Sequence, residues 1–212
     1  MLFLTSNFDK MYIEFKNHFS SWPLISLLEI EKAFPKLDKR RLFEWSQKGY
    51  IVNVKRGFYR FTDQPINQGL LYFAANKLYH PSYISLETAL SYYHVIPEAV
   101  FSFTSISTLN TTQQISSLGN FSYKHLKANL FFGYKLIEIN GLNSSIANLE
   151  KTILDYLYFH SELKTMLDFQ ALRWDKERLK EMDFQKSEDY LALFESKALI
   201  KRYSLLINYL ND

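Results

Sequence analysis

A basic segment with the pattern of a helix followed directly by a β-hairpin places the strongest constraint on this chain. Residues 36–62 read KLDKRRLFEWSQKGYIVNVKRGFYRFT. Asp38 is a favourable N-cap, and residues 39–48 include good helix formers. Gly49 follows them at the place where a helix C-terminus favours a residue that tolerates positive φ. The pattern therefore predicts a helix over residues 39–48.

The residues after Gly49 predict a hairpin. Residues 50–54 are rich in β-branched side chains, residues 55–57 read Lys-Arg-Gly, and residues 58–62 are rich in aromatic side chains. Glycine at the third loop position suits a three-residue hairpin loop, in which a type I turn is followed by a bulge. We therefore expect a strand, a loop of three residues and a second strand.

Two further helices are predicted upstream. The apolar residues of segment 24–34 recur at helical spacing and stop before Pro35, as in the first helix of a helix-turn-helix. Segment 6–19 carries an amphipathic stripe of aromatic and methionine side chains, which favours packing against its own domain over a dimer seam. With the basic helix and hairpin, these segments predict an N-terminal winged helix-turn-helix domain.

The distribution of charge separates this region from the rest of the chain. Between residues 36 and 60 there are eight basic residues and two acidic ones, a balance of +6, whereas the whole chain carries +3. Residues 66–212 hold 14 basic and 15 acidic residues and are nearly neutral. This asymmetry is typical of a nucleic-acid-binding module attached to a domain with another role.

We expect contacts to double-stranded DNA from nine side chains of the helix and hairpin: Lys36, Lys39, Arg40, Arg41, Glu44, Gln47, Lys48, Lys55 and Arg56. Arg40 and Gln47 have planar donor groups that suit guanine and adenine edges in the major groove. Lys39, Arg41 and Lys48 are better placed for phosphates.

Steps of 100° per residue place Leu42 and Trp45 on the inner side of this helix, opposite Arg40, Glu44, Gln47 and Lys48, which form its outer face. Glu44 repels phosphate, so we expect it to read cytosine or to orient an arginine. The lysine and arginine at the hairpin tip suit the DNA backbone or the minor groove. The alternative interpretation is a solvated basic helix beside an ordinary hairpin.

The composition excludes several classes of protein. The 212 residues include no cysteine, which excludes disulfides and thiolate metal sites and fits a cytoplasmic protein. No apolar run approaches the roughly 18 residues of a membrane span, and residues 1–9 lack the pattern of a signal peptide. We expect no membrane association.

The fold class predicted is α+β, with a winged-helix domain over residues 1–65 and a mixed α/β domain over residues 66–212 that ends in helices. The polar segment 62–69 makes the boundary between them. A small sheet is expected within residues 82–140, closed by an Asn-Gly turn, and helices within residues 146–212. Its strands are predicted at residues 100–105, 120–126 and 134–139, and a strand that leads into a helix at residues 82–95.

Motifs of catalysis are missing. The six glycines form neither GxGxxG nor a P-loop, and neither HExxH nor GxSxG occurs. The five histidines have no metal-ligand spacing. Glu87, Glu150 and Asp155 are interpreted as helix-start and surface groups. We therefore expect a protein that is not an enzyme, with no catalytic residue, metal or cofactor.

Three motifs carry a resemblance to a known family. They are Arg-Gly-Phe-Tyr at residues 56–59, the segment ISLETAL at residues 84–90 and the segment ANLEKTILD at residues 147–155. In these motifs, and over roughly residues 20–160, the chain resembles the AbiEi family of antitoxins from bacterial abortive-infection systems.

The resemblance implies a DNA-binding autorepressor of its own operon, with DNA binding in the N-terminal domain. It assigns to the C-terminal domain the activity of a type IV antitoxin, which counteracts a nucleotidyltransferase-like toxin without a stable complex. The chain is not that toxin, because none of its six glycines precedes a serine. Two alternatives stay open: a winged-helix regulator whose C-terminal domain senses a ligand, and, less favoured, an enzyme with a winged-helix appendage.

Overall fold

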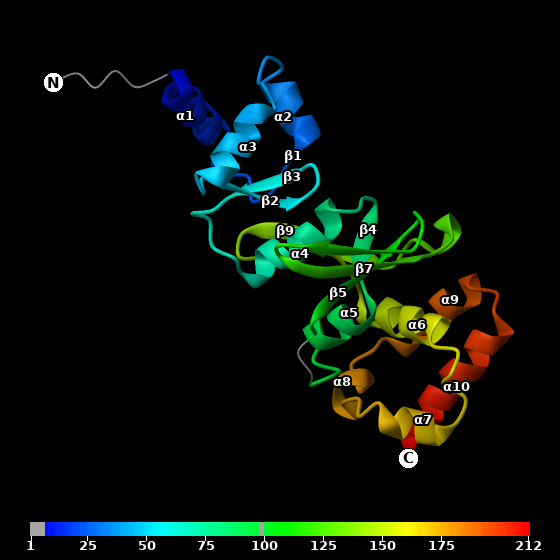
Figure 1. Cartoon of the computed structure of the whole chain (residues 1–212). Helices are drawn as coiled ribbons and strands as arrows, with labels where there is room; N and C mark the ends of the chain where they lie inside the picture. The colour runs from blue at the N-terminus through cyan, green and yellow to red at the C-terminus, as the bar shows by residue number, and fades with distance from the viewer. Residues whose placement is uncertain (1–6, 98–99) are drawn as a thin grey trace.

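Three helices and a three-stranded antiparallel sheet form the N-terminal part of the protein. The computed structural model describes residues 7–97 and 100–212 and has an α+β fold (Figure 1). The N-terminal elements are α1 (Asn7–Phe19), β1 (Ile25–Ser26), α2 (Leu27–Ala33), α3 (Arg40–Gln47), β2 (Ile51–Lys55) and β3 (Phe58–Phe61). The strands lie in the order β1-β3-β2.

The helix predicted over residues 24–34 begins later than expected. Ser26 is its N-cap, because the Ser26 hydroxyl accepts the N–H of Glu29 at 3.3 Å and the Glu29 carboxylate accepts the N–H of Ser26 at 2.7 Å. This capping box starts α2 at Leu27 and leaves Ile25 and Ser26 extended, so that they pair with β3. A short strand therefore precedes the helix.

The hairpin is confirmed with a shorter loop. Lys55 pairs directly with Phe58, which leaves a loop of two residues, Arg56 and Gly57. Gly57 has φ of +83°, a left-handed conformation that glycine adopts without strain. The irregularity in strand pairing lies one step upstream, between Asn53 and Lys55.

Aromatic side chains build the N-terminal core. Phe15 and Phe19 of α1 are fully buried and pack with Trp45 of α3 and Phe61 of β3. The expectation that α1 packs against its own domain is confirmed by these contacts. Ser6 and the side chain of Phe8, which belong to the predicted segment, lie outside the part that the structure describes.

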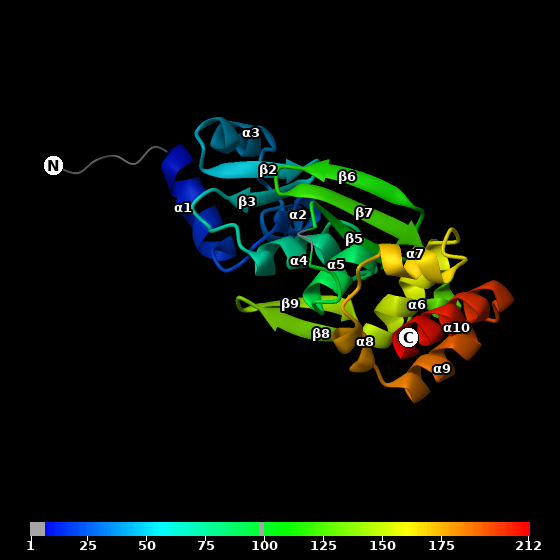
Figure 2. The same ribbon diagram turned by 90° about the horizontal axis from the view of Figure 1, so that it is seen from below.

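A six-stranded mixed sheet forms the centre of the remaining chain, in the order β6-β7-β5-β4-β9-β8 (Figure 2). The pairs β5–β7 and β4–β9 are parallel, and the other neighbours are antiparallel. Its strands are β4 (Ser82–Ile84), β5 (Ser102–Ser107), β6 (Thr112–Ser116), β7 (Gly119–His125), β8 (Tyr134–Ile139) and β9 (Leu142–Ala147).

Helices cover both faces of this sheet. On one face lies α4 (Gln68–Lys77), and on the other lie α5 (Leu86–Tyr92) and α6 (Leu149–Phe159). The remaining helices pack mainly against α6 or one another: α7 (Met166–Ala171), α8 (Lys176–Lys180), α9 (Phe184–Leu193) and α10 (Lys197–Asn211), with a short 3-10 helix at Ala128–Leu130. Within residues 7–97 and 100–212, none has the length and apolarity needed to cross a lipid bilayer.

The expected mixed sheet followed by helices is confirmed, and three elements of it were missed. These are helix α4, strand β6 and strand β9, so the sheet extends to Ala147 and not to residue 140. The predicted Asn-Gly turn closes the β8–β9 hairpin, with φ of +52° at Asn140 and +76° at Gly141.

Alternation along the central strands divides the core into two layers. Tyr83 of β4 and Ala147 of β9 face a core shared with α5, α6 and the C-terminal helices. Their neighbours Ile84 and Ile146 face a second core, which α4 covers. Successive strand residues point to opposite faces of the sheet, so the side chains of adjacent apolar residues pack in two different cores.

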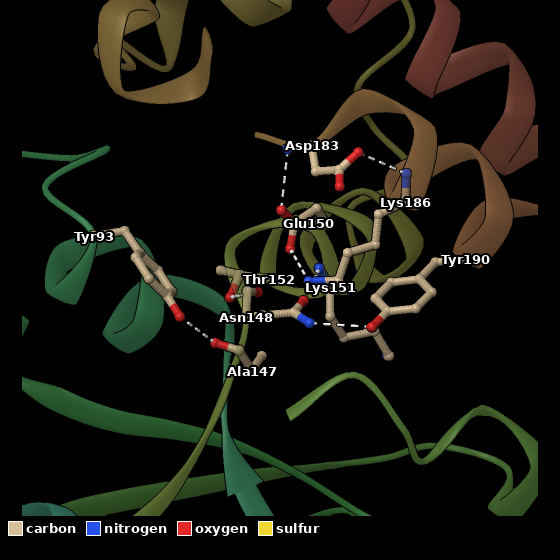
Figure 3. A network of polar contacts seen from close by, with 9 residues as sticks. All are labelled: Tyr93, Ala147, Asn148, Glu150, Lys151, Thr152, Asp183, Lys186 and Tyr190. Atoms are coloured by element: carbon tan, nitrogen blue, oxygen red, sulfur yellow. Dashed lines mark hydrogen bonds and ion pairs between the residues drawn. The ribbon is translucent and has the colours of Figure 1, made fainter. Parts of the chain in front are cut away.

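The start of α6 is tied to its neighbours by a polar network (Figure 3). The Asn148 carboxamide caps α6 by accepting the N–H of Lys151 at 2.9 Å and donates to the Tyr190 hydroxyl at 3.2 Å. Glu150 accepts hydrogen bonds from the Asp183 N–H and the Lys186 ammonium, each at 3.1 Å. These bonds hold α9 against the first turn of α6.

A fully buried ion pair joins the first and second turns of α6. Lys151 and Asp155 have no exposed side-chain surface and form a salt bridge. Asp155 also accepts hydrogen bonds from the Ser85 hydroxyl at 2.8 Å and the Tyr83 hydroxyl at 3.0 Å. Burial lowers the pKa of Lys151 and raises that of Tyr83, while Asp155 favours the charged lysine.

The buried pair generates a test of stability. We expect Lys151→Met to lower the free energy of unfolding by about 3–5 kcal/mol, because Asp155 is left as a buried charge without its cation. The double variant Lys151→Met, Asp155→Leu should be more stable than Lys151→Met, since it removes both charges. Urea unfolding followed by circular dichroism measures both. Lys201→Met, at an exposed site on α10, is the control and should change stability by less than about 0.5 kcal/mol.

The N-terminal elements pack directly on the rest of the protein. Leu24 and Val54 belong to the core under α4, together with Phe121 of β7. The backbone carbonyl of Val54 accepts the N–H of Ser117, in the β6–β7 turn, at 3.0 Å. The proposed division at residues 65 and 66 stays a prediction, but the surfaces on either side of it are in contact.

An ion pair crosses the same boundary. Glu29 of α2 forms a salt bridge with Lys77 of α4, and both side chains are about one-quarter exposed. Burial alone would raise the pKa of the Glu29 carboxyl, but hydrogen bonds from Lys77 and Ser26 outweigh it and lower the pKa below its ordinary value of 4.5.

This lowered pKa predicts a pH-dependent contribution to stability. Because the folded pKa lies below the unfolded one, the contribution is present above pH 4.5 and is lost as the pH falls through the folded value. We expect Glu29→Gln to cost about 1 kcal/mol at neutral pH and progressively less as the pH falls below 4.5. Glu31→Gln, which removes an exposed ion pair from the same helix, is the control. A Glu29→Gln effect that stays constant from neutral to acid pH would contradict the assignment.

Candidate nucleic-acid interface

Packing of its inner side holds α3 in place. Trp45 is fully buried, and its ring centre lies 4.8 Å from that of Phe15 and 5.4 Å from that of Tyr12. Leu42 is buried in the same core, as the helical steps predict. The Asp38 carboxylate accepts the N–H of Arg40 at 2.9 Å, so Asp38 helps to cap the helix, which runs from Arg40 to Gln47.

The predicted outer face of α3 is accessible. Arg40, Gln47 and Lys48 are exposed, and Glu44 is half-buried. Glu44 accepts a hydrogen bond from Arg41 at 3.0 Å. Of the two roles expected for Glu44, the structure shows the orientation of an arginine.

Two further cations flank the helix. Lys39 is exposed and forms an ion pair with Glu31 of α2, with 2.6 Å between its ammonium and the carboxylate. Lys36 lies in the turn between α2 and α3, where it lines a small groove with Met11 and Phe34. Both remain on the surface, as a role in phosphate binding requires.

The hairpin tip is anchored at both ends. The Gly57 carbonyl accepts the N–H of Leu27 at 2.7 Å, and Val54 is bonded to the β6–β7 turn. Lys55 is half-buried, and burial lowers its pKa, whereas Arg56 is exposed. The tip is therefore a fixed corner and not a projecting loop. At about 3.3 Å per residue, Lys55 lies roughly 13 Å along β2 from Ile51.

One basic residue of the segment does not reach the surface. Arg60 is 5% exposed, and its guanidinium donates a hydrogen bond to the backbone carbonyl of Gln64. It holds the chain after β3 and contributes no exposed cation. The eight basic residues counted in the sequence therefore supply seven that reach the surface at least in part.

Sequence reasoning missed one residue of the interface. Phe43 is 66% exposed on α3. Helical steps of 100° place it about 60° from Arg40 and 40° from Gln47, so it belongs to the outer face. The helical period of α3 already indicates this position, although an apolar residue of an amphipathic helix is expected in the core.

Among the described residues, the acidic side chains of Glu87, Glu150 and Asp155 lie in separate polar contacts. Asp155 and Glu150 are buried, contrary to the expected surface positions, and each has its own set of partners. Glu87 faces His160 with 3.7 Å between their nearest charged atoms. Within residues 7–97 and 100–212, no group of three or more metal-binding side chains occurs.

Comparison of the sequence with models of known protein families finds no match. Comparison with curated proteins finds no significant match either. The resemblance to AbiEi antitoxins therefore stays a prediction that rests on the three sequence motifs alone.

Proposed function

We propose that residues 1–65 form a winged helix-turn-helix domain that binds double-stranded DNA. The observation that carries this proposal is the outer face of α3, where exposed Arg40 and Gln47 lie on a helix whose opposite side is packed into an aromatic core. A rigid helix with planar donor groups on its free side is the form that reads base edges in a major groove.

The order of elements supports the same proposal. The chain passes through α1, β1, α2, α3, β2 and β3, and the three strands pair in the order β1-β3-β2. This order supports our proposal that α3 is the second helix of a helix-turn-helix and that the β2–β3 hairpin is the wing. Arg56 at the hairpin tip is exposed and suits the DNA backbone.

We propose further that the protein is an autorepressor of its own operon and the antitoxin of a type IV toxin–antitoxin system. It would counteract a nucleotidyltransferase-like toxin without a stable complex. The resemblance of the three motifs to AbiEi antitoxins supports this. Ser85 of one motif donates a hydrogen bond to Asp155 of another, so these two motifs meet in a buried core. We therefore assign antitoxicity to the surface of the C-terminal part.

A ligand-sensing regulator is the second candidate. A cavity of about 380 Å³ is lined by Ser102, Ser122, Gln113, Lys124 and His160, among others. Polar side chains around a cavity favour a small hydrophilic ligand. The neighbouring gene separates the candidates, because a nucleotidyltransferase beside this gene favours the antitoxin.

The DNA-binding proposal predicts a defined salt dependence. If about four cations contact phosphates, the logarithm of the affinity should fall with the logarithm of salt concentration at a slope near −3.6, about −0.9 per contact. Removing two proposed phosphate contacts in Lys39→Ala, Arg41→Ala should bring the slope near −1.8. Fluorescence anisotropy with a labelled duplex measures both.

The control for this titration is Lys197→Ala, Lys201→Ala, which removes the same charge from exposed positions on α10. It should leave the slope unchanged. A wild-type slope near zero would exclude DNA binding by this surface.

The proposal also predicts that repression and antitoxicity are separable. In full-length protein, we expect Lys39→Ala, Arg40→Ala, Arg41→Ala to lose repression because three contacts to DNA are removed. Alanine is preferable to glutamate because Lys39 and Arg41 pair with Glu31 and Glu44, which a reversed charge would repel. Growth rescue on coexpression with the neighbouring toxin should persist. Loss of rescue at unchanged protein level would show that antitoxicity depends on DNA binding.

A further inference from the structure

An exposed aromatic ring lies midway along α3, at one edge of its outer face. Phe43 is 66% exposed, although it lies three residues after Arg40 and four residues before Gln47, both of which are polar. Among the described residues, its side chain belongs to none of the three hydrophobic clusters. Phe43 is therefore the one large apolar group that α3 presents outward.

The position of Phe43 matches the spacing of stacked bases. Arg40 and Gln47 are seven residues apart, which is about 10.5 Å along a helix at 1.5 Å per residue. Base pairs in B-DNA are about 3.4 Å apart, so this span corresponds to roughly three base steps. Along the helix axis, Phe43 lies between the two side chains proposed to read bases, and around the axis it lies 40° to 60° to one side of both.

We propose that Phe43 reads the C5-methyl group of a thymine between the bases contacted by Arg40 and Gln47. The proposal rests on the DNA-binding function above. A phenyl ring has no hydrogen-bonding group, and the thymine methyl is the apolar feature that a major groove offers to such a side chain. The outer face then combines hydrogen-bond readout at both ends with apolar readout in the middle.

The surroundings of Phe43 favour a nucleic acid over a protein partner. The ring is isolated on α3 and is flanked by Arg40 and Gln47, with the cations Lys39 and Lys48 at the two ends of the helix. A protein-docking patch requires a contiguous apolar area, and the interface cores of proteins are depleted in lysine. A single apolar ring surrounded by cations suits the major groove of DNA, where a thymine methyl group lies between negatively charged phosphate backbones.

Removal of single methyl groups tests the proposal directly. Full-length protein is first used to select tight-binding duplexes from a random pool. In the selected duplex, each thymine is then replaced in turn by deoxyuridine, which removes the methyl and retains base pairing. We expect one position at which wild-type affinity falls about fourfold, the value for transfer of one methyl-sized group from water.

The variant Phe43→Ala identifies the reader of that methyl. It should bind the thymine duplex more weakly than wild type and show no further loss with deoxyuridine at the sensitive position. Its salt slope should stay unchanged, because Phe43 contacts no phosphate. Phe43→Leu, which keeps an apolar side chain, should retain part of the methyl sensitivity.

Leu136→Ala is the matched control, since Leu136 is 72% exposed but lies on β8. It should behave as wild type in every arm. Wild-type protein that tolerates every deoxyuridine, or Phe43→Ala with the same sensitivity as wild type, would overturn the inference and leave DNA binding intact. Failure to enrich any duplex would overturn the proposed function and the inference with it.

Discussion

The buried ion pair of Lys151 and Asp155 is the interaction on which the C-terminal architecture depends. A charge pair without exposed surface is tolerated only where further polar groups satisfy it, and here Tyr83 and Ser85 do so. Those two residues come from β4 and the turn after it, whereas the pair lies on α6. The requirement for mutual satisfaction therefore fixes α6 against the centre of the sheet, and α9 is attached to the first turn of the same helix through Glu150.

A second constraint joins the proposed DNA-binding part to that framework. Val54, near the tip of the hairpin, contributes its side chain to the core under α4 and its carbonyl to a hydrogen bond from Ser117. Glu29 and Lys77 form a further link between α2 and α4. The hairpin and α3 are consequently positioned by contacts on both sides, and α3 presents its outer face from a rigid base. Such support favours precise base contacts, which loosely held helices cannot maintain.

The candidate interface was predictable as a segment, but the roles of its individual residues were less so. The helical period correctly placed Leu42 and Trp45 inside and Arg40 and Gln47 outside. The apolar side of a helix turns toward the core, and this orientation leaves the residues of the opposite side exposed. Arg60 was counted with the surface charges, yet the chain after β3 folds back and buries it. For Glu44 the sequence allowed either cytosine readout or the orientation of an arginine, and only the structure shows its hydrogen bond with Arg41. Phe43 was overlooked because an apolar residue in an amphipathic helix is by default a core residue.

The sequence by itself determined the local elements: the Asp38 and Gly49 signals, the hairpin, the Asn140-Gly141 turn and the helical period of the C-terminal part. Each of these depends on residues within a few positions of one another, so local propensity is sufficient. Only the tertiary structure decided the pairing order β6-β7-β5-β4-β9-β8 and the burial of Lys151 and Asp155. Strand partners and buried charges depend on groups distant in sequence, such as Ser85 and Asp155, which are 70 residues apart. A single sequence carries no local signal for such pairs. Two residues far apart in the chain interact only after folding has brought them together and buried both.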